Sequence, residues 1–489
     1  MERLTGLDAA FLALETPSTH MHVMATMVLD PSDVPGGFTV DTLRELIAER
    51  LPRLEPFRRR VVEVPFGVHH PVWIEDPDFD LDYHVRRAAL PAPGGMKELA
   101  ELTAEIAGRQ LDRRRPLWEL WVVEGLEHGH VGVIAKMHHA AIDGVLGVDL
   151  MTEIFDLEPT PAPPKPPEEL PEPERLPSDA ELLLGAFTSI ARQPLRMVRA
   201  SRNLARSAIR VVQRVRSGPV SAGVPLTAPA SPLNGVLTPH RRVAFTSVPL
   251  ADIKEVKRAF RVTVNDVVLA VCAGALRQFL ELHGAVPDKP LLAAIPASVR
   301  TPDERGVMGN RVSAMFATLA TQLDDPVDRL FAAREVMGGA KLVHEDIGGN
   351  TLHEWAEVAA PVMFSRGMRL YERLVQGRHP PIINLIVSNV PGPSFPLYCA
   401  GARLVSLFPL GPVLAGTGLN VTVLSYRDSV GFGLIGCREM VPNLDDIAAA
   451  VPDALAELVK AAQEQADGGP TGAQSLRPVE LNGANKSVS

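Results

Sequence analysis

The chain has 489 residues, of which 46% are hydrophobic and 22% charged, and its formal net charge is −9. This length is sufficient for two or three domains with substantial cores, and the composition excludes disorder of the chain as a whole. The negative charge argues against nucleic acid as the main partner.

The cysteines and the first residues bear on location. Only Cys272, Cys399 and Cys437 are present, and their odd number and wide spacing exclude a disulfide framework and suit a reducing cytoplasm. Glu2 and Asp8 lie where a secretory signal would have a basic start followed by an apolar core. No uninterrupted apolar run approaches the ~20 residues that cross a bilayer. We therefore expect a cytoplasmic protein, not secreted and without a transmembrane helix, that contacts membranes only peripherally.

The first part of the chain mixes helical and strand patterns. Apolar spacing predicts helices over residues 41–51, 96–111 and 145–155, and strand-like runs predict strands over 58–64, 69–74 and 131–137. We interpret residues 1–157 as a first lobe, followed by a linker over 158–180. Proline recurs there too often for a helix or a sheet, so the linker is expected to be extended and solvated.

A stripe of arginines runs through the connecting segment, residues 181–238. No acidic residue occurs between Arg192 and Arg216, and arginine recurs every three or four residues, at positions 192, 196, 199, 202, 206, 210 and 214. At 100° per residue these arginines share one face of a helix. A basic amphipathic helix in an acidic protein indicates peripheral contact with an anionic membrane or a lipid inclusion. A solvated helix that packs by its apolar face is the equal alternative.

The second lobe is expected over residues 239–466. Strands are predicted over 242–248, 291–295, 311–319, 382–388, 419–426 and 430–435, and helices over 250–260, 265–283 and 443–465. Several of the strands are apolar enough to be buried on both faces. Gly284 closes the second helix, and the third is predicted to break at Pro452. Residues 467–489 are rich in glycine, serine, asparagine and proline, which predicts a disordered tail.

The segment with the most chemistry is MHHAAIDG, residues 137–144, at the end of the predicted strand 131–137. Side chains on a strand alternate between its faces. His138 and His139 therefore cannot easily serve one centre, and one of them can face a cavity while the other supports the loop. Asp143 is a possible N-cap of the helix that follows. Two histidines and a carboxylate in this setting indicate a site where a hydroxyl group is deprotonated.

Two simpler interpretations stand beside this one. Adjacent histidines can be hydrogen-bonded structural residues, which these residues alone leave open. They can also be metal ligands, but a catalytic zinc site needs three protein ligands, often with two histidines on one helical face, and the pattern matches neither feature. We therefore expect no metal. His69-His70 shows how little the bare dipeptide says, because no aspartate and glycine follow it in this spacing.

Several segments together resemble the bacterial wax ester synthase/acyl-CoA:diacylglycerol acyltransferase family, within the CoA-dependent acyltransferases that include chloramphenicol acetyltransferase and peptide-synthetase condensation domains. In order, these segments are residues 7–12 with Glu15, 21–23, 116–118 (PLW), 138–144 (HHxxxDG), 265–266 (ND), 296–300 with 309–310, and 388–393 (SNVPGP). The resemblance covers nearly the whole chain. It implies an α/β fold of two chloramphenicol acetyltransferase-like lobes with mixed sheets and an active site in a tunnel between them.

The resemblance also implies roles for the motif. His139 is the expected general base, which takes the proton from an acceptor hydroxyl as that oxygen attacks the thioester of acyl-CoA, with no acyl-enzyme; such a base contributes about 10²–10⁴-fold. His138 supports the loop. Asp143 is expected to hold the loop by pairing with a basic side chain. Gly144 permits close approach of the backbone.

The other motif residues have both structural and functional interpretations. Asn265 with Asp266 reads as an asparagine N-cap followed by an acid in the first turn, or Asn265 donates a hydrogen bond near the developing oxyanion. Trp118 is more typical of a core anchor than of a substrate contact.

Substrate contacts elsewhere rest on the resemblance alone. They are expected at the PLW element, Pro116, Leu117 and Trp118, and at Ser388 and Asn389.

The implied activity is transfer of a long-chain acyl group from acyl-CoA to diacylglycerol, giving triacylglycerol, or to a long-chain alcohol, giving a wax ester. Acyl-CoA is then a co-substrate and no cofactor is expected. A carrier-protein-dependent condensation or polyketide acyltransferase is the enzymatic alternative, against which the lack of an adjoining carrier domain argues. A non-catalytic lipid-binding or lipid-droplet protein with the same fold is the other. Chain length, acceptor preference and oligomeric state are left open.

Overall fold

A computed structural model describes residues 1–142, 144–160, 173–191, 201–202, 206, 223–299, 310–347, 357 and 381–467. Four sequence predictions fall wholly or mostly outside these ranges. They are the basic helix over 192–216, the centre of the proline-rich linker, the tail after residue 467, and Asp143 as an N-cap.

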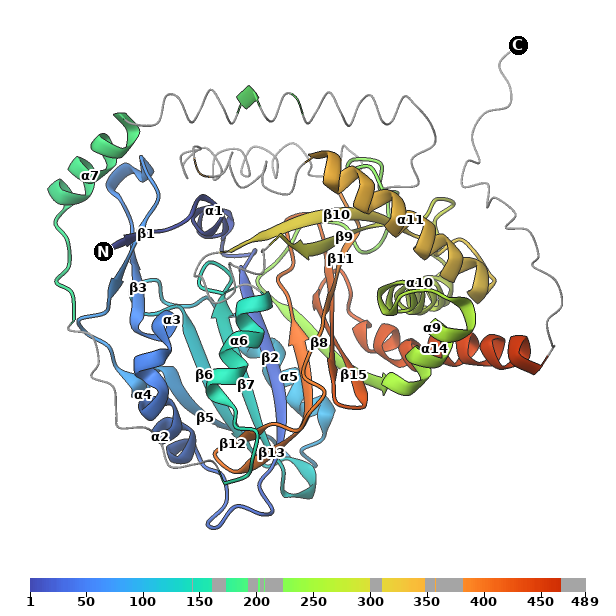
Figure 1. Ribbon diagram of the computed structural model, residues 1–489, viewed down its shortest axis with the longest axis horizontal. Coiled ribbons are helices and arrows are strands. Elements are labelled where there is room, and N and C mark those ends of the chain that lie inside the picture. Colours follow the sequence, from blue (N-terminus) through green and yellow to red (C-terminus); the bar gives the residue numbers. More distant parts are fainter. Residues whose placement is uncertain are drawn as a thin grey trace.

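In the described part of the chain, two six-stranded mixed sheets form the framework (Figure 1). The first sheet has the order β12-β13-β2-β7-β6-β5 and is antiparallel except between β5 and β6. Its strands are β2 (His22–Asp30), β5 (Val85–Ala89), β6 (Trp118–Glu124), β7 (Val131–His138), β12 (Tyr398–Cys399) and β13 (Ala402–Leu410).

Helices cover both faces of the first sheet. On one face α2 (Val40–Arg50) and α6 (Gly144–Ile154) pack on β6 and β7, and Leu43 and Ile47 of α2 are buried in that core. On the other face lies α5 (Met96–Ala107). Two short helices, α3 (Glu55–Arg58) and α4 (Leu81–His84), lie on the same face as α2.

A small three-stranded sheet lies beside the first. It has the order β1-β4-β3, from β1 (Glu2–Arg3), β3 (Arg59–Val62) and β4 (Val72–Glu75). Helix α7 (Asp179–Ala191) packs on it through Leu182 and Ala186. Helix α1 (Gly6–Leu14) follows β1 and is capped by Thr5, whose hydroxyl accepts from the backbone N–H of Asp8.

The second sheet has the order β10-β9-β11-β14-β15-β8, with parallel pairs on both sides of β11. Its strands are β8 (Arg241–Pro249), β9 (Leu291–Ser298), β10 (Val312–Leu319), β11 (Leu385–Val390), β14 (Leu419–Tyr426) and β15 (Ser429–Cys437). Figure 1 shows its helices beyond the sheet, on the side away from the first sheet: α9 (Leu250–Phe260), α10 (Val264–Leu282), α11 (Pro326–Ile347) and α14 (Leu444–Asp467). Every residue of α10 from Asp266 to Leu276 is buried, because neighbouring elements surround it.

The two halves of the chain interlock through β13. This strand lies within the second half of the sequence, between β11 and β14, yet it pairs antiparallel with β2 and so belongs to the first sheet. It crosses β15 so closely that a Cβ on Gly433 would lie 1.9 Å from the carbonyl oxygen of Pro409, and one on Gly431 would lie 2.4 Å from that of Leu407. Glycine is needed where two backbones approach this closely. On the other face of the first sheet, α5 shares a core with β8 and β15.

Most predicted elements occur within a few residues of their predicted ends. The predicted break at Pro452 is wrong, because α14 continues through it. Val451 and Leu455 on either side of the proline are buried against the second sheet and α10, and this packing holds the helix together. Several elements were not predicted, among them β6, α7, α11 and β13.

None of the helices in the described ranges has the length and apolar composition of a membrane span. Only when α9 and α10 are taken together do their length and composition match a span, and the two helices are bent by 107° at their junction.

Candidate functional site

The two adjacent histidines lie where β7 ends. The backbone N–H of His138 donates to the carbonyl oxygen of Leu117 at 3.0 Å, and that of His139 donates to the carbonyl oxygen of Met21 at 2.7 Å. These acceptors flank β7 on its two sides, since Leu117 precedes β6 and Met21 precedes β2. The backbone of the pair is thus fixed between two neighbouring strands.

His138 is part of the protein interior. Its side chain is 1% exposed, its Nδ1 accepts from the backbone N–H of Ala140 at 3.0 Å, and its Nε2 lies 3.6 Å from the carboxylate of Glu15. Burial lowers the pKa of His138, and this outweighs the opposing effect of Glu15. The imidazole is therefore neutral near pH 7, with its proton on Nε2, because Nδ1 acts as an acceptor.

His139 contacts both halves of the chain. Its Nδ1 lies 3.1 Å from Oδ1 of Asn310, the second residue before β10. The ring of Phe11, on α1, lies 4.3 Å from the imidazole between ring centroids. The site is therefore built from α1, the turn after β7 and the approach to β10. Gly144 is the first residue of α6, and Asp143 is not among the residues described.

Helix α1 brings three side chains to this site. Asp8 and Phe11 lie three residues apart on one side of the helix, and Glu15 is the C-cap residue that follows its last turn. Asp8 contacts Asn310, Phe11 contacts His139, and Glu15 lies beside His138. Sequence reasoning gave these residues no role. Their spacing in LDAAFLALE was the available signal.

Glu15 is a buried carboxylate with a cationic partner. Arg113 donates to its Oε2 from Nε at 2.8 Å and from one terminal nitrogen at 2.6 Å. Burial alone would raise the pKa of Glu15, but the contacts with His138 and Arg113 hold it at about 2. Glu15 is thus ionised, and Arg113 supplies its counter-charge.

Asn265 is not the N-cap of α10, so that interpretation is wrong. The cap is Thr263, whose hydroxyl accepts from the N–H of Asp266, while the carboxylate of Asp266 accepts from the N–H of Thr263 at 2.8 Å. This capping box satisfies two helix-end donors. Oδ1 of Asn265 instead accepts from Nδ2 of Asn389 at 3.3 Å. The ND and SNVPGP motifs therefore meet, which the sequence did not indicate.

Trp118 lies in the core. It is 1% exposed, its indole N–H donates to the carbonyl oxygen of Phe57 at 2.9 Å, and its ring stacks between those of Phe57 and His84. Pro116 and Leu117 are also buried. Ser388 lies on β11, opposite Thr422 of β14. Substrate contacts by Pro116, Leu117, Ser388 and Asn389 stay predictions.

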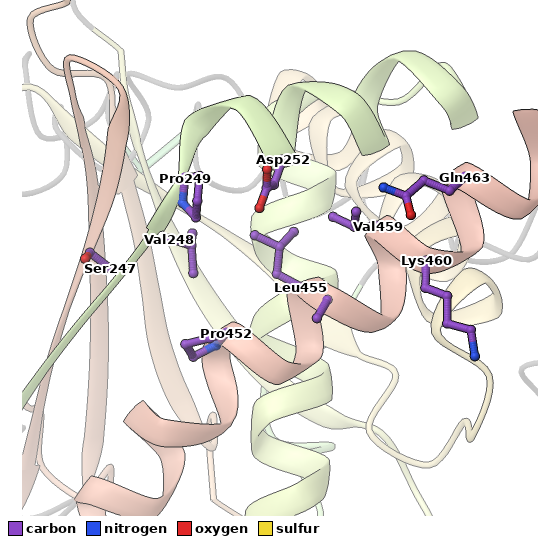
Figure 2. Close-up of a pocket in the computed structure, with 10 residues that line it drawn as sticks. Ser247, Val248, Pro249, Asp252, Pro452, Leu455, Val459, Lys460 and Gln463 are labelled. Atoms are coloured by element: carbon purple, nitrogen blue, oxygen red, sulfur yellow. The ribbon is translucent and has the colours of Figure 1, made fainter.

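A surface pocket of about 280 Å³ lies elsewhere (Figure 2). The end of β8, α9 and α14 line it, with Asp252 on one side and Pro452 and Lys460 on the other. None of its lining residues belongs to the histidine site, so this pocket is not the expected tunnel, which stays a prediction. Across the described ranges, no group of three or more histidine, cysteine, aspartate or glutamate side chains could hold a metal ion.

Solved structures first define the fold class. The first condensation domain of the CDA synthetase aligns with a TM-score of 0.58 and 14% identity, covering 95% of this chain and 97% of that one. At this identity the likeness shows the fold alone. The chain thus has the two-lobed α/β fold of the condensation-domain class, as its motifs predicted.

Sequence then specifies the family. The wax ester synthase/diacylglycerol acyltransferase catalytic domain matches residues 4–268, and the C-terminal domain of the same family matches residues 308–459. A wax ester synthase/diacylglycerol acyltransferase from Marinobacter aquaeolei VT8 is 30% identical, with a TM-score of 0.65, and covers 94% of this chain and 100% of its own. A putative diacylglycerol O-acyltransferase of Mycobacterium tuberculosis is 39% identical, covering 96% of this chain and 92% of its own. The chain belongs to this family of acyltransferases, and the predicted resemblance is confirmed.

Proposed function

We propose that this chain transfers a long-chain acyl group from acyl-CoA to the hydroxyl of diacylglycerol, and also to long-chain alcohols. The main support is the 39% identity, over nearly the full length of both chains, to a relative named as a putative diacylglycerol O-acyltransferase. The solved relative from Marinobacter is named for both wax ester and diacylglycerol products, which supports the two acceptor classes. Condensation domains share only the fold, so the carrier-protein alternative is disfavoured.

In the proposed reaction His139 is the general base. Its Nε2 takes the proton from the acceptor hydroxyl while that oxygen forms a bond to the thioester carbonyl carbon. The tetrahedral intermediate collapses by breaking the carbon–sulfur bond, and the departing thiolate of CoA receives the proton from the imidazolium. No acyl-enzyme forms. A base placed in this way contributes about 10²–10⁴-fold.

The test is CoA release from palmitoyl-CoA, with diacylglycerol and hexadecanol supplied in parallel and the ester products identified. We expect release to depend on an acceptor and His139→Ala to lower kcat by about 10²–10⁴-fold. His130→Ala is the matched control, because that residue lies at the other end of β7, in the turn before it. Release without either acceptor indicates a thioesterase, and unchanged acylation by His139→Ala rejects the base assignment.

We also propose peripheral contact with an anionic lipid surface through the arginine stripe. The periodicity of arginine over residues 192–216 supports it, as does the exposed apolar face of α7 just before that segment, where Leu184 and Phe187 are 68% and 63% exposed. Liposome co-sedimentation should fall as salt rises, because screening weakens exposed charge contacts. Binding that is indifferent to salt and to anionic lipid content rejects the contact.

A further inference from the structure

The side-chain amide of Asn310 contacts the imidazole of His139. The other hydrogen bonds of that amide determine whether its oxygen or its nitrogen faces the ring. Nδ2 of Asn310 lies 2.5 Å from Oδ1 of Asp8 and 2.7 Å from the backbone carbonyl oxygen of His139. The same Oδ1 of Asp8 accepts from the backbone N–H of Asn310 at 3.1 Å. Both partners of Nδ2 are therefore acceptors, which fixes the NH₂ end of the amide on them.

The carbonyl end of that amide then faces Nδ1 of His139 at 3.1 Å. An amide oxygen has no hydrogen to donate, so Nδ1 must carry the proton of this contact. A neutral imidazole has a single N–H, and the hydrogen bond made by one nitrogen determines the state of the other. Nε2 of His139 therefore bears the lone pair.

We infer that Asn310, oriented by Asp8, is a positioning residue that fixes His139 in the Nδ1–H tautomer and makes Nε2 the basic nitrogen. The inference rests on the proposed function, in which His139 is the base. Asn310 and Asp8 are 1% and 2% exposed, so water does not compete for these hydrogen bonds, and their geometry is enforced by the interior.

The neighbouring histidine shows that the orientation is specific to His139. Nδ1 of His138 accepts from the N–H of Ala140, which puts its proton on Nε2, toward Glu15. The two adjacent imidazoles thus have opposite tautomers. Asp8 comes from α1 and Asn310 from the approach to β10, so the working tautomer of His139 depends on the two halves of the chain being docked.

The direct measurement is the ¹⁵N NMR spectrum of protein labelled at histidine, recorded above the pH at which imidazole titrates. His139→Ala identifies the signals of His139 by their loss. We expect Nδ1 of His139 to be protonated and Nε2 to have the shift of an unprotonated ring nitrogen. Asn310→Ala should give a mixture of tautomers at His139. Protonated Nε2 in the unmodified protein, or an unchanged tautomer in Asn310→Ala, overturns the inference.

Asp8→Asn tests the orientation of the amide with little change in shape. With a second amide at position 8, Asn310 can reverse and present NH₂ to Nδ1, which places the proton on Nε2. We expect kcat to fall by about 10²–10³-fold, within the range of a lost general base. Asn384→Ala is the matched control, a buried asparagine that also donates from Nδ2 to several partners, in the second half of the chain. It should lower stability and leave kcat of the folded protein and the His139 tautomer unchanged.

The double variant Asp8→Asn/Asn310→Asp provides the rescue. A carboxylate at 310 accepts from Nδ1–H and from the amide at position 8, so the Nδ1–H tautomer returns, while the carbonyl oxygen of His139 loses the donor that Nδ2 of Asn310 supplied. We expect kcat at least tenfold above that of Asp8→Asn alone. A charge beside the imidazole favours its protonated form, so the acid limb of the pH–kcat profile should move to higher pH. Activity no better than that of Asp8→Asn, with the tautomer restored, overturns the positioning role.

Separate readouts test His139 as the base and Asn310 as its positioning residue. The tautomer is read from the spectrum without any turnover. If His139→Ala keeps full activity, the proposed base is wrong, whatever the spectrum shows. If His139→Ala is inactive while Asp8→Asn and Asn310→Ala keep full kcat, the base stands and the role of Asn310 is rejected.

Discussion

Nε2 of His138 lies 3.6 Å from the carboxylate of Glu15, and both side chains are buried. The pair connects the end of α1 to the turn that carries His139. Because Arg113 neutralises Glu15 from the other side, the carboxylate can stay ionised in the interior.

Glu15 should make stability depend on pH in the acid range. Its pKa is about 2 in the folded chain, against an ordinary value of 4.5. A depressed carboxyl pKa contributes stability that is fully present above about pH 4.5 and is lost as the pH falls toward 2. We expect Glu15→Gln to lower the free energy of unfolding at pH 7 by about 1–3 kcal/mol and to flatten its dependence between those values, measured by urea unfolding.

Glu63→Gln is the control for that experiment. Glu63 also contacts Arg113, at 3.0 Å, but its side chain is 66% exposed. An exposed pair contributes about 0–1 kcal/mol, so the loss should be small and the pH dependence retained. Equal effects of the two variants would contradict the assignment of the buried pair.

Gly433→Ala should strongly destabilise the protein, because its Cβ would overlap the carbonyl oxygen of Pro409 on β13. Backbone atoms cannot move aside as a flexible side chain can, so we expect a loss of about 1–3 kcal/mol or more. The control is Gly338→Ala in α11, where nothing lies within 4 Å of the added Cβ. That change should stabilise by about 0.5–1 kcal/mol. Thermal unfolding measures both, and similar shifts would show that β13 does not cross β15 as described.

Asn265→Ala should leave stability nearly unchanged and lower kcat by about 10²–10³-fold if Asn265 donates to the oxyanion. Its Oδ1 faces Asn389, so its Nδ2 is the end that can donate. Thr263→Ala, which removes the true cap, should cost about 0.5–2 kcal/mol instead. Kinetics and urea unfolding of both variants separate the two roles, and unchanged kcat in Asn265→Ala rejects the oxyanion assignment.

Asn389→Ala extends that experiment. Because Asn389 holds the amide of Asn265, its loss should also lower kcat, and the double variant should be little worse than Asn265→Ala alone. Additive losses would show that the two asparagines act independently.

Trp118→Phe should lower stability by about 1–2 kcal/mol, since it removes a buried hydrogen bond to Phe57 and part of a stacked ring. A core role predicts unchanged KM for palmitoyl-CoA and for diacylglycerol. A several-fold rise in KM with unchanged Tm would make Trp118 a substrate contact.

Much of the framework could be predicted from the sequence because its signals are local. The alternation of residues in β8 and the apolar periodicity of α9 and α10 are properties of short windows, and the structure has these elements within a few residues of their predicted ends. The HHxxxDG segment likewise identified His138 and His139, since a strand, a polar turn and a helix follow one another there.

Cap and helix-break signals were less reliable. Asn265 and Thr263 are both ordinary capping residues, and only the helix itself shows which one precedes its first turn. Pro452 breaks helices in isolation, but burial of its neighbours on the second sheet overrides that preference.

The sequence by itself determined the family and many of the local elements, and it predicted the central histidine, because each of these signals depends on residues close together in the chain. Only the tertiary structure decided that β13 joins the first sheet, that Asp8 and Asn310 reach His139, and that Glu15 reaches His138. These contacts join residues far apart in the sequence, and nothing in a short window specifies the partner of a buried polar side chain. Packing of the two halves supplies that information, and with it the orientation of the imidazole.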